Sequence, residues 1–158
     1  MLNQSKKTLS AQTSNSFFTL AVAPAKVIRG SRILNQAVSS ISRLGNRPLI
    51  VSGNSTLDIA ENYLELLESK KLDFVKASYG PDCSESSLKA LRDKAQAHEA
   101  DVIIGIGGGK ALDTAKLLAY QLEIPVVTIP TSAATCAAWT ALSNVYSDEG
   151  AFLYDEAL

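Results

Sequence analysis

Side chains that often carry chemistry are scarce in this chain. Its 158 residues include one histidine, His98, and two cysteines, Cys83 and Cys136. The cysteines lie far apart and fit neither a zinc-binding spacing nor a disulfide framework, so no zinc-type cluster can be assembled from these residues. Such sparse cysteine usage favours a reducing compartment, and we expect a cytoplasmic protein.

A strong charge of either sign and long apolar runs are also missing. The formal net charge is −1, which is not typical of proteins that bind nucleic acid or anionic lipid. No apolar run reaches the length of a membrane-spanning helix, which is about 20 residues. We therefore expect neither nucleic acid nor a membrane as a partner. The length indicates about one domain, large enough to bury a core.

Acidic residues are absent from the start of the chain, where the first is Asp58. Residues 1–16 are rich in Ser, Thr, Asn and Gln, which is typical of a disordered polar tail. An organelle transit peptide would also be acid-poor and Ser-rich, but it would carry arginine, which this stretch lacks. We therefore assign residues 1–16 to a disordered tail and residues 17–158 to one folded domain.

Short apolar runs alternate with segments of helical periodicity along the rest of the chain. The runs predict strands over residues 17–23, 25–29, 48–52, 72–77, 101–106 and 125–129. Helices are expected from the cap Ser31 to a C′ glycine at Gly45, from Ser55 or Thr56 to about residue 67, from the cap Ser84 to His98, and over 110–121. This alternation predicts right-handed crossovers. The expected fold is α/β, a doubly wound, mostly parallel, Rossmann-like sheet, followed by a C-terminal β-hairpin over 144–154.

The most informative segment is residues 101–116, DVIIGIGGGKALDTAK. A buried strand leads into Gly107, Gly108 and Gly109, which open a helix. Glycines let a ligand approach the backbone, and a helix N-terminus offers free N–H groups and a positive dipole end, so the segment suits a pyrophosphate. It is not a Walker A loop, because no glycine lies five residues before Gly109 and Ala111 follows the lysine in place of Ser or Thr. It is not G-x-G-x-x-G either, because Lys110 stands in the third glycine place after Gly105 and Gly107. A tight turn without a ligand is the alternative, although three glycines in a row are costly for a turn alone.

Three segments together, GIGGGKALDTAK, IPVVTIPTSAAT and TALSNVYSDEG, resemble the iron- or zinc-dependent alcohol and polyol dehydrogenases, most of all the glycerol dehydrogenases. The resemblance extends from about Pro24 to the end of the chain. It implies that residues 17–158 are the dinucleotide-binding domain of an oxidoreductase that uses NAD or NADP and a small alcohol or polyol. Glycerol-1-phosphate dehydrogenases and dehydroquinate-synthase-like enzymes are alternatives within the same superfamily, and the segment TALSNVY speaks against them.

The resemblance also implies which residues bind the cofactor. Those expected to line the phosphates are Gly107, Gly108, Gly109, Lys110, Ala111, Leu112 and Asp113. Those expected along the ribose and nicotinamide, or at further pocket positions, are Thr131, Ser132, Thr140, Leu142 and Tyr146. Two alternatives stay open: Asp113 would fix the loop without touching ligand, and Tyr146 would pair across the hairpin with Tyr154.

Two departures from the family bear on specificity. In the family, the turn after the strand at 48–52 carries an acidic residue that holds the adenosine ribose, and here that place is Gly53. Loss of that carboxylate opens the site to NADP. Cys136 stands where glycerol dehydrogenases have an aspartate near the substrate hydroxyls. By this position we expect Cys136 to face the substrate. Because a thiol is a weak hydrogen-bond acceptor, we also expect a substrate other than glycerol.

The family's metal is held by an aspartate and histidines of a helical second domain that would follow Leu158. We therefore expect that domain to be absent from this chain, and neither zinc nor iron to be bound by it. We assign no catalytic residue and expect no turnover of alcohols by the chain alone. The alternative is a truncated, non-catalytic nucleotide-binding or assembly module.

An exposed cleft wall over residues 133–139, with Trp139 as a packing residue, predicts a homo-oligomer. We expect Cys83 to be inert and His98 to be solvated.

Overall fold

The computed structural model describes residues 23–158, apart from the side chains of residues 57–63. The expected tail and the expected strand before Ala23 lie outside this part. The elements are α1 (Leu34–Ile41), β1 (Pro48–Ser52), α2 (Asn54–Ser69), β2 (Val75–Ser78), α3 (Glu85–His98), β3 (Val102–Gly107), α4 (Gly109–Leu122), β4 (Val126–Pro130), the 3₁₀ helix η1 (Ala137–Trp139), β5 (Leu142–Tyr146) and β6 (Phe152–Ala157). None of the helices in the described part combines the length and apolarity that crossing a bilayer requires.

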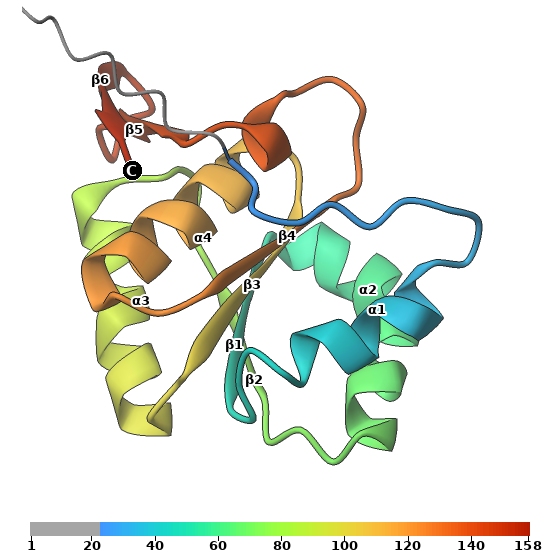
Figure 1. The fold of residues 1–158 in the computed structure, drawn as a ribbon. Helices are drawn as coiled ribbons and strands as arrows, with labels where there is room; N and C mark the ends of the chain where they lie inside the picture. The colour runs from blue at the N-terminus through green and yellow to red at the C-terminus, as the bar shows by residue number, and fades with distance from the viewer. Residues whose placement is uncertain (1–22) are drawn as a thin grey trace, which may run out of the picture.

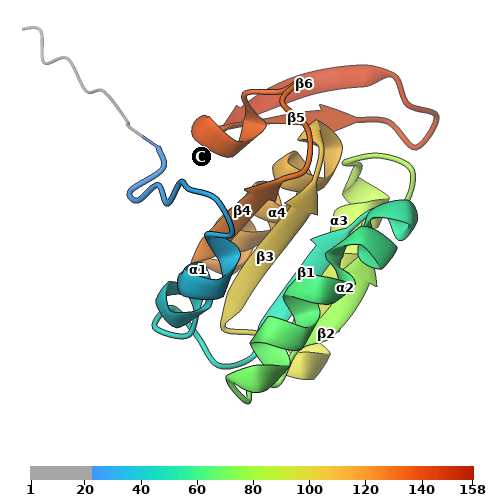
Figure 2. The ribbon, with the colours of Figure 1, turned by 90° about the vertical axis from the view of Figure 1, so that its right-hand side faces the viewer.

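Four strands form a parallel sheet in the order β2-β1-β3-β4. The central strands β1 and β3 are buried at every position, because helices cover both faces of the sheet. Helices α1 and α2 lie over one face of the sheet, and α3 and α4 lie over the other (Figures 1 and 2). The antiparallel pair β5–β6 lies across the carboxyl ends of the strands (Figure 2). The predicted doubly wound α/β fold with a C-terminal hairpin is confirmed.

The order of the strands creates a switch point between β1 and β3. From β1 the chain turns outward through α2 to β2, whereas from β3 it turns the opposite way through α4 to β4. In open parallel sheets, ligands bind beyond the carboxyl ends of the strands at such a point. Gly53 follows β1 there, and the glycine loop Gly107–Gly109 follows β3.

The start of the described part differs from expectation. Residues 25–29 form no strand and are exposed. The first helix begins after Ile33 without a side-chain cap, since Arg32 takes a left-handed φ of 53° and helical geometry starts only beyond it. The predicted cap at Ser31 is therefore wrong.

Gly45 is required for packing and does not end the first helix, which stops at Ile41. A Cβ on Gly45 would lie 2.3 Å from Oδ1 of Asp101. The Asp101 carboxylate accepts hydrogen bonds from the backbone N–H groups of Asn46 and Arg47, each at 2.8 Å. The absent side chain at Gly45 thus makes room for the carboxylate that joins the starts of β1 and β3.

Two other boundaries shift by a few residues. Helix α2 starts at Asn54 with Gly53 as its N-cap, ahead of Ser55 and Thr56. Strand β2 starts at Val75, because Leu72 donates its N–H to the Leu67 carbonyl at the end of α2 and is buried with that helix. Ser84 caps α3 as predicted, accepting a hydrogen bond from the Ser87 N–H at 3.3 Å.

The hairpin pairs different aromatic residues from those expected. A register shift between Val145 and Tyr146 places Phe152 opposite Tyr146, and Tyr154 opposite Val145. The rings of Tyr146 and Phe152 meet edge to face with centroids 6.0 Å apart. The predicted pair of Tyr146 with Tyr154 is wrong.

The structure also tests three expectations about single residues. Trp139 is 46% exposed, and within the expected exposed wall it is Ala137 and Ala138 that are instead buried, against Leu112. His98 is not simply solvated, since its Nε2 lies 2.8 Å from the Asp73 carbonyl oxygen. Cys83 is fully buried, and burial raises the pKa of its thiol, which agrees with an inert residue.

Candidate functional site

The glycine loop at the end of β3 leaves the start of α4 open. Gly108 is the N-cap of α4, and no side chain of the described residues caps that end. A Cβ added to Gly108 would meet no heavy atom within 4 Å in the described part of the chain. The space beside Gly108 is therefore free, and the first N–H groups and positive dipole end of α4 make this helix start a place where an anion can bind.

Close packing holds this loop in place. A Cβ on Gly105 in β3 would lie 2.5 Å from Cβ of Ala115, and one on Gly107 would lie 2.8 Å from Cβ of Ala111. Gly107 also has a φ of 149°, which disfavours any other residue. Helix α4 can thus approach β3 closely, and residues 111–119 are all buried between the sheet and the hairpin.

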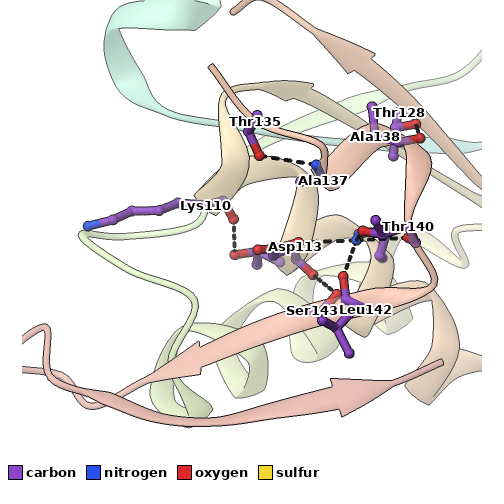
Figure 3. Close-up of polar contacts among 11 residues, drawn as sticks. Lys110, Asp113, Thr128, Thr135, Ala137, Ala138, Thr140, Leu142 and Ser143 are labelled. Atoms are coloured by element: carbon purple, nitrogen blue, oxygen red, sulfur yellow. Dashed lines mark hydrogen bonds and ion pairs between the residues drawn. The ribbon is translucent and has the colours of Figure 1, made fainter. Parts of the chain in front are cut away.

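Lys110, in the first turn of α4, points away from the helix (Figure 3). Its side chain is 51% exposed, and its Nζ lies 2.6 Å from Oδ1 of Asp82. The close contact with the Asp82 carboxylate raises the pKa of Lys110 above its ordinary value, so the ammonium stays charged. Asp82 was not predicted, and its only sequence signal was its place in the loop that follows a strand.

A buried ion pair in α4 joins the helix to the chain after η1. Lys116 Nζ lies 3.1 Å from Oδ1 of Asp113, and the two side chains are 6% and 10% exposed. Lys116 also donates to the carbonyl oxygens of Thr140, at 3.1 Å, and of Leu142, while Ser143 Oγ donates to the Asp113 carbonyl at 3.1 Å (Figure 3). Burial raises the pKa of Asp113, and the nearby charge of Lys116 opposes that rise. These contacts favour the interpretation in which Asp113 fixes the site.

The segment after β4 lies beside the glycine loop. The Thr131 N–H donates to the Gly107 carbonyl at 3.0 Å. Thr135 Oγ1 accepts from the Ala137 N–H at 3.0 Å and would lie 3.2 Å from a Cβ on Gly109. Thr131, Ser132 and Cys136 are exposed along this segment. Hydroxyl groups therefore lie next to the open end of α4.

The structure brings together only part of the predicted cofactor set. Around the open end of α4 it gathers Gly107, Gly108, Gly109, Lys110 and Thr131, with the Tyr146 ring centroid 5.8 Å from Lys110 Nζ. Ala111 and Leu112 are buried in packing. The Thr140 carbonyl is bound by Lys116, while Leu142 is 40% exposed. Gly53 lies at the neighbouring strand end, where a Cβ would be 3.6 Å from the Tyr79 ring.

The described residues do not fit a metal ion. Among them no group of three or more His, Cys, Asp or Glu side chains is placed to hold one. We therefore assign no part of any reaction on this chain to a metal.

Comparison with known proteins agrees with this geometry. The family model of iron-containing alcohol dehydrogenases matches residues 24–155. An uncharacterised oxidoreductase of Synechocystis is 50% identical over 141 residues, and a glycerol dehydrogenase of Escherichia coli is 37% identical over 131 residues. The structure of a probable glycerol dehydrogenase from Sinorhizobium meliloti superposes with a TM-score of 0.68 at 27% identity, over 79% of this chain and 34% of that one.

The chain therefore belongs to the iron-containing alcohol dehydrogenase family. The matches cover 89% of this chain for the Synechocystis protein and 82% for the E. coli enzyme. Only 36% of each relative's own length takes part in the match. The chain thus spans about a third of the length of these relatives.

The buried ion pair gives a testable prediction about stability. Lys116→Met removes the partner of a buried carboxylate, and we expect the free energy of unfolding at neutral pH to fall by about 3–5 kcal/mol. Denaturant titration measures this value. The double variant Asp113→Asn/Lys116→Met leaves no uncompensated charge and should recover much of the loss. Equal losses in the single and double variants would contradict this account.

The pH dependence of that loss follows from the carboxylate. In Lys116→Met, burial raises the pKa of Asp113 without the opposing charge and hydrogen bond of Lys116, and only the backbone hydrogen bond from Asn144 still lowers it. The native state then holds the proton at a pH where the unfolded state has released it, so stability falls as the pH rises through that interval. The deficit relative to wild type should therefore shrink as the pH falls below the raised pKa toward the ordinary value.

Proposed function

We propose that this chain is the NAD(P)-binding part of an oxidoreductase that acts on a small alcohol or polyol. The observation that carries the proposal is the free space beside Gly108, the N-cap of α4, at the switch point of the sheet. A pyrophosphate there would accept hydrogen bonds from the first N–H groups of α4 and meet the charge of Lys110. Family membership supports the dinucleotide as the source of that pyrophosphate.

The residues of this chain bind and orient the cofactor. The dinucleotide, when bound, supplies the group that accepts or donates a hydride. The hydroxyls of Thr131 and Ser132 are exposed beside the glycine loop and can hydrogen-bond the ribose. Tyr146 and Leu142 on β5 present an aromatic and an aliphatic surface on the hairpin side of the loop, suited to the nicotinamide. We assign no catalytic residue to this chain.

The substrate class rests on Cys136. It is exposed in the loop that follows β4, where we expect the substrate end of the cofactor. A thiol there offers a weak acceptor to a second hydroxyl, which disfavours the neighbouring hydroxyls of glycerol. We therefore propose an alcohol or hydroxy compound whose hydroxyls are not recognised by a carboxylate at this place.

We also propose self-association with a second copy of this chain. Apolar side chains are exposed on the edge strand β4, on η1 and on the hairpin: Val126, Trp139, Leu142, Phe152, Leu153 and Tyr154. Phe152, Leu153 and Tyr154 are consecutive on β6, and a group of exposed apolar side chains of this kind favours association. A monomer by light scattering at every concentration measured would contradict it.

Binding of the dinucleotide is the direct test. We expect saturable calorimetric titrations with NAD⁺ or NADP⁺ for the wild-type chain. Gly108→Val should weaken the Kd by about tenfold or more, because its side chain fills the space that the pyrophosphate needs and displaces charged hydrogen bonds.

The design separates binding from folding. Gly108 has φ −84° and ψ −169°, an extended conformation that valine adopts readily, so the thermal midpoint should stay near that of wild type. Ala25→Val, at an exposed position outside every element, is the matched control. Undiminished binding by Gly108→Val, or no binding of either dinucleotide by the wild type, would overturn the proposal.

The choice between NAD⁺ and NADP⁺ is predicted to depend on Gly53. Gly53→Asp places a carboxylate at the end of β1, where it repels a 2′-phosphate and can bind ribose hydroxyls. We expect the ratio of the two Kd values to shift toward NAD⁺ by about tenfold, which corresponds to about 1.4 kcal/mol.

The backbone allows this change. Gly53 has φ −77° and ψ 154°, and a Cβ there meets the Tyr79 ring at an ordinary 3.6 Å. Gly53→Asn has nearly the same shape without the charge and is the control, which should shift the ratio much less. An equal shift with both variants would show that bulk and not charge decides, against the prediction.

A further inference from the structure

We propose that Asp82 is a positioning residue of the dinucleotide site, which acts by holding the ammonium group of Lys110 beside the glycine loop. The inference rests on the proposed function, because a pyrophosphate is the anion that this ammonium would meet. Asp82 lies in the loop between β2 and α3, 28 positions before Lys110 in the sequence. Only the tertiary structure brings the two together.

The loop that carries Asp82 is itself held in place. The Tyr146 N–H donates to the Cys83 carbonyl at 2.8 Å, and Tyr154 Oη donates to Glu85 at 2.9 Å. Ser86 Oγ donates to the Asp148 carboxylate at 2.5 Å. Three contacts with the hairpin thus fix the residues directly after Asp82. An anchor for Lys110 at this place has little freedom to move.

The ion pair is asymmetric in its exposure. The Asp82 side chain is 8% exposed, whereas that of Lys110 is 51% exposed. In the described part of the chain, no hydrogen bond of regular geometry reaches the buried Asp82 Oδ1, so the ammonium of Lys110 at 2.6 Å offsets its charge. If Lys110 moved away, a buried carboxylate would lose its compensating charge, which is strongly unfavourable. Lys110 therefore keeps its position beside Asp82, and an anionic ligand would bind to an ammonium group that is already in place.

The position of the ammonium suits that role. An ammonium has three donors, and the contact with Asp82 uses one of them, so others remain for phosphate oxygens. The centroid of the Tyr146 ring lies 5.8 Å from Lys110 Nζ. The ammonium thus lies close to both the β2–α3 loop and the hairpin, on a side chain that starts in the first turn of α4. Fixing it before the ligand arrives lowers the entropy lost on binding.

A double-mutant cycle tests the inference in the full chain. Asp82→Asn keeps the shape of the side chain and removes its charge. We expect it to weaken the Kd for NAD⁺ or NADP⁺ by about three- to tenfold, since one charged contact is no longer held in place. In a Lys110→Met background the same change should have almost no further effect, because Asp82 acts through Lys110.

Each outcome has a clear meaning. Tighter binding by Asp82→Asn would overturn the inference, because Asp82 would then compete with the phosphates for Lys110. An equal loss in both backgrounds would overturn it too, since Asp82 would then act without Lys110. Asp82→Glu, which keeps the charge, serves as the second variant if Asp82→Asn does not fold, and should bind within about twofold of wild type. Thermal unfolding checks each variant.

A second measurement needs no dinucleotide. An amine-reactive ester acylates Lys110, and mass spectrometry measures the rate. This rate reports how far the amine is kept charged and shielded from the reagent. We expect this rate to rise several-fold in Asp82→Asn, while that of the exposed Lys70 stays unchanged. Equal Lys110 rates in the two proteins would overturn its placement by Asp82. If the wild type binds neither dinucleotide, the proposed function fails, and this measurement still decides whether Asp82 holds Lys110.

Discussion

The close contact between α4 and β3 is the constraint on which the rest of the structure depends. It is possible because Gly105 has no side chain where Ala115 packs, and Gly107 has none where Ala111 packs. With α4 held against the central strand, its N-terminus must open at the carboxyl edge of the sheet. The loop after β4 and the hairpin then have one surface to pack on, which is the buried side of α4.

Two ion pairs of α4 illustrate how burial changes the role of similar groups. Asp113 and Lys116 are both shielded from solvent. They pair with each other and hydrogen-bond within the protein, and so they join the hairpin to the helix. Lys110 is half exposed and pairs with a buried partner, so its remaining donors face solvent. The first pair therefore stabilises the site, while the second leaves a cation available to an anionic ligand.

The places where sequence-based expectations were wrong share a cause. Gly45 was interpreted as a helix end, but its role depends on Asp101, which lies far along the chain. The partner of Tyr146 was misassigned because a register shift within β5 is invisible to an alternating pattern. Ala137 and Ala138 were expected in an exposed wall, yet they are the residues that contact α4. Each of these depends on a contact distant in sequence or on strand register, which local periodicity does not encode.

The sequence by itself determined the order of strands and helices, the parallel sheet and the glycine loop at the start of α4. These follow from apolar periodicity and from glycines adjacent in the chain, which are local properties. The tertiary structure alone decided that Asp82 meets Lys110, that Lys116 binds the carbonyls before β5, and that the hairpin holds the β2–α3 loop. These contacts join segments separated by about twenty to seventy residues, and only packing on one buried helix brings them together.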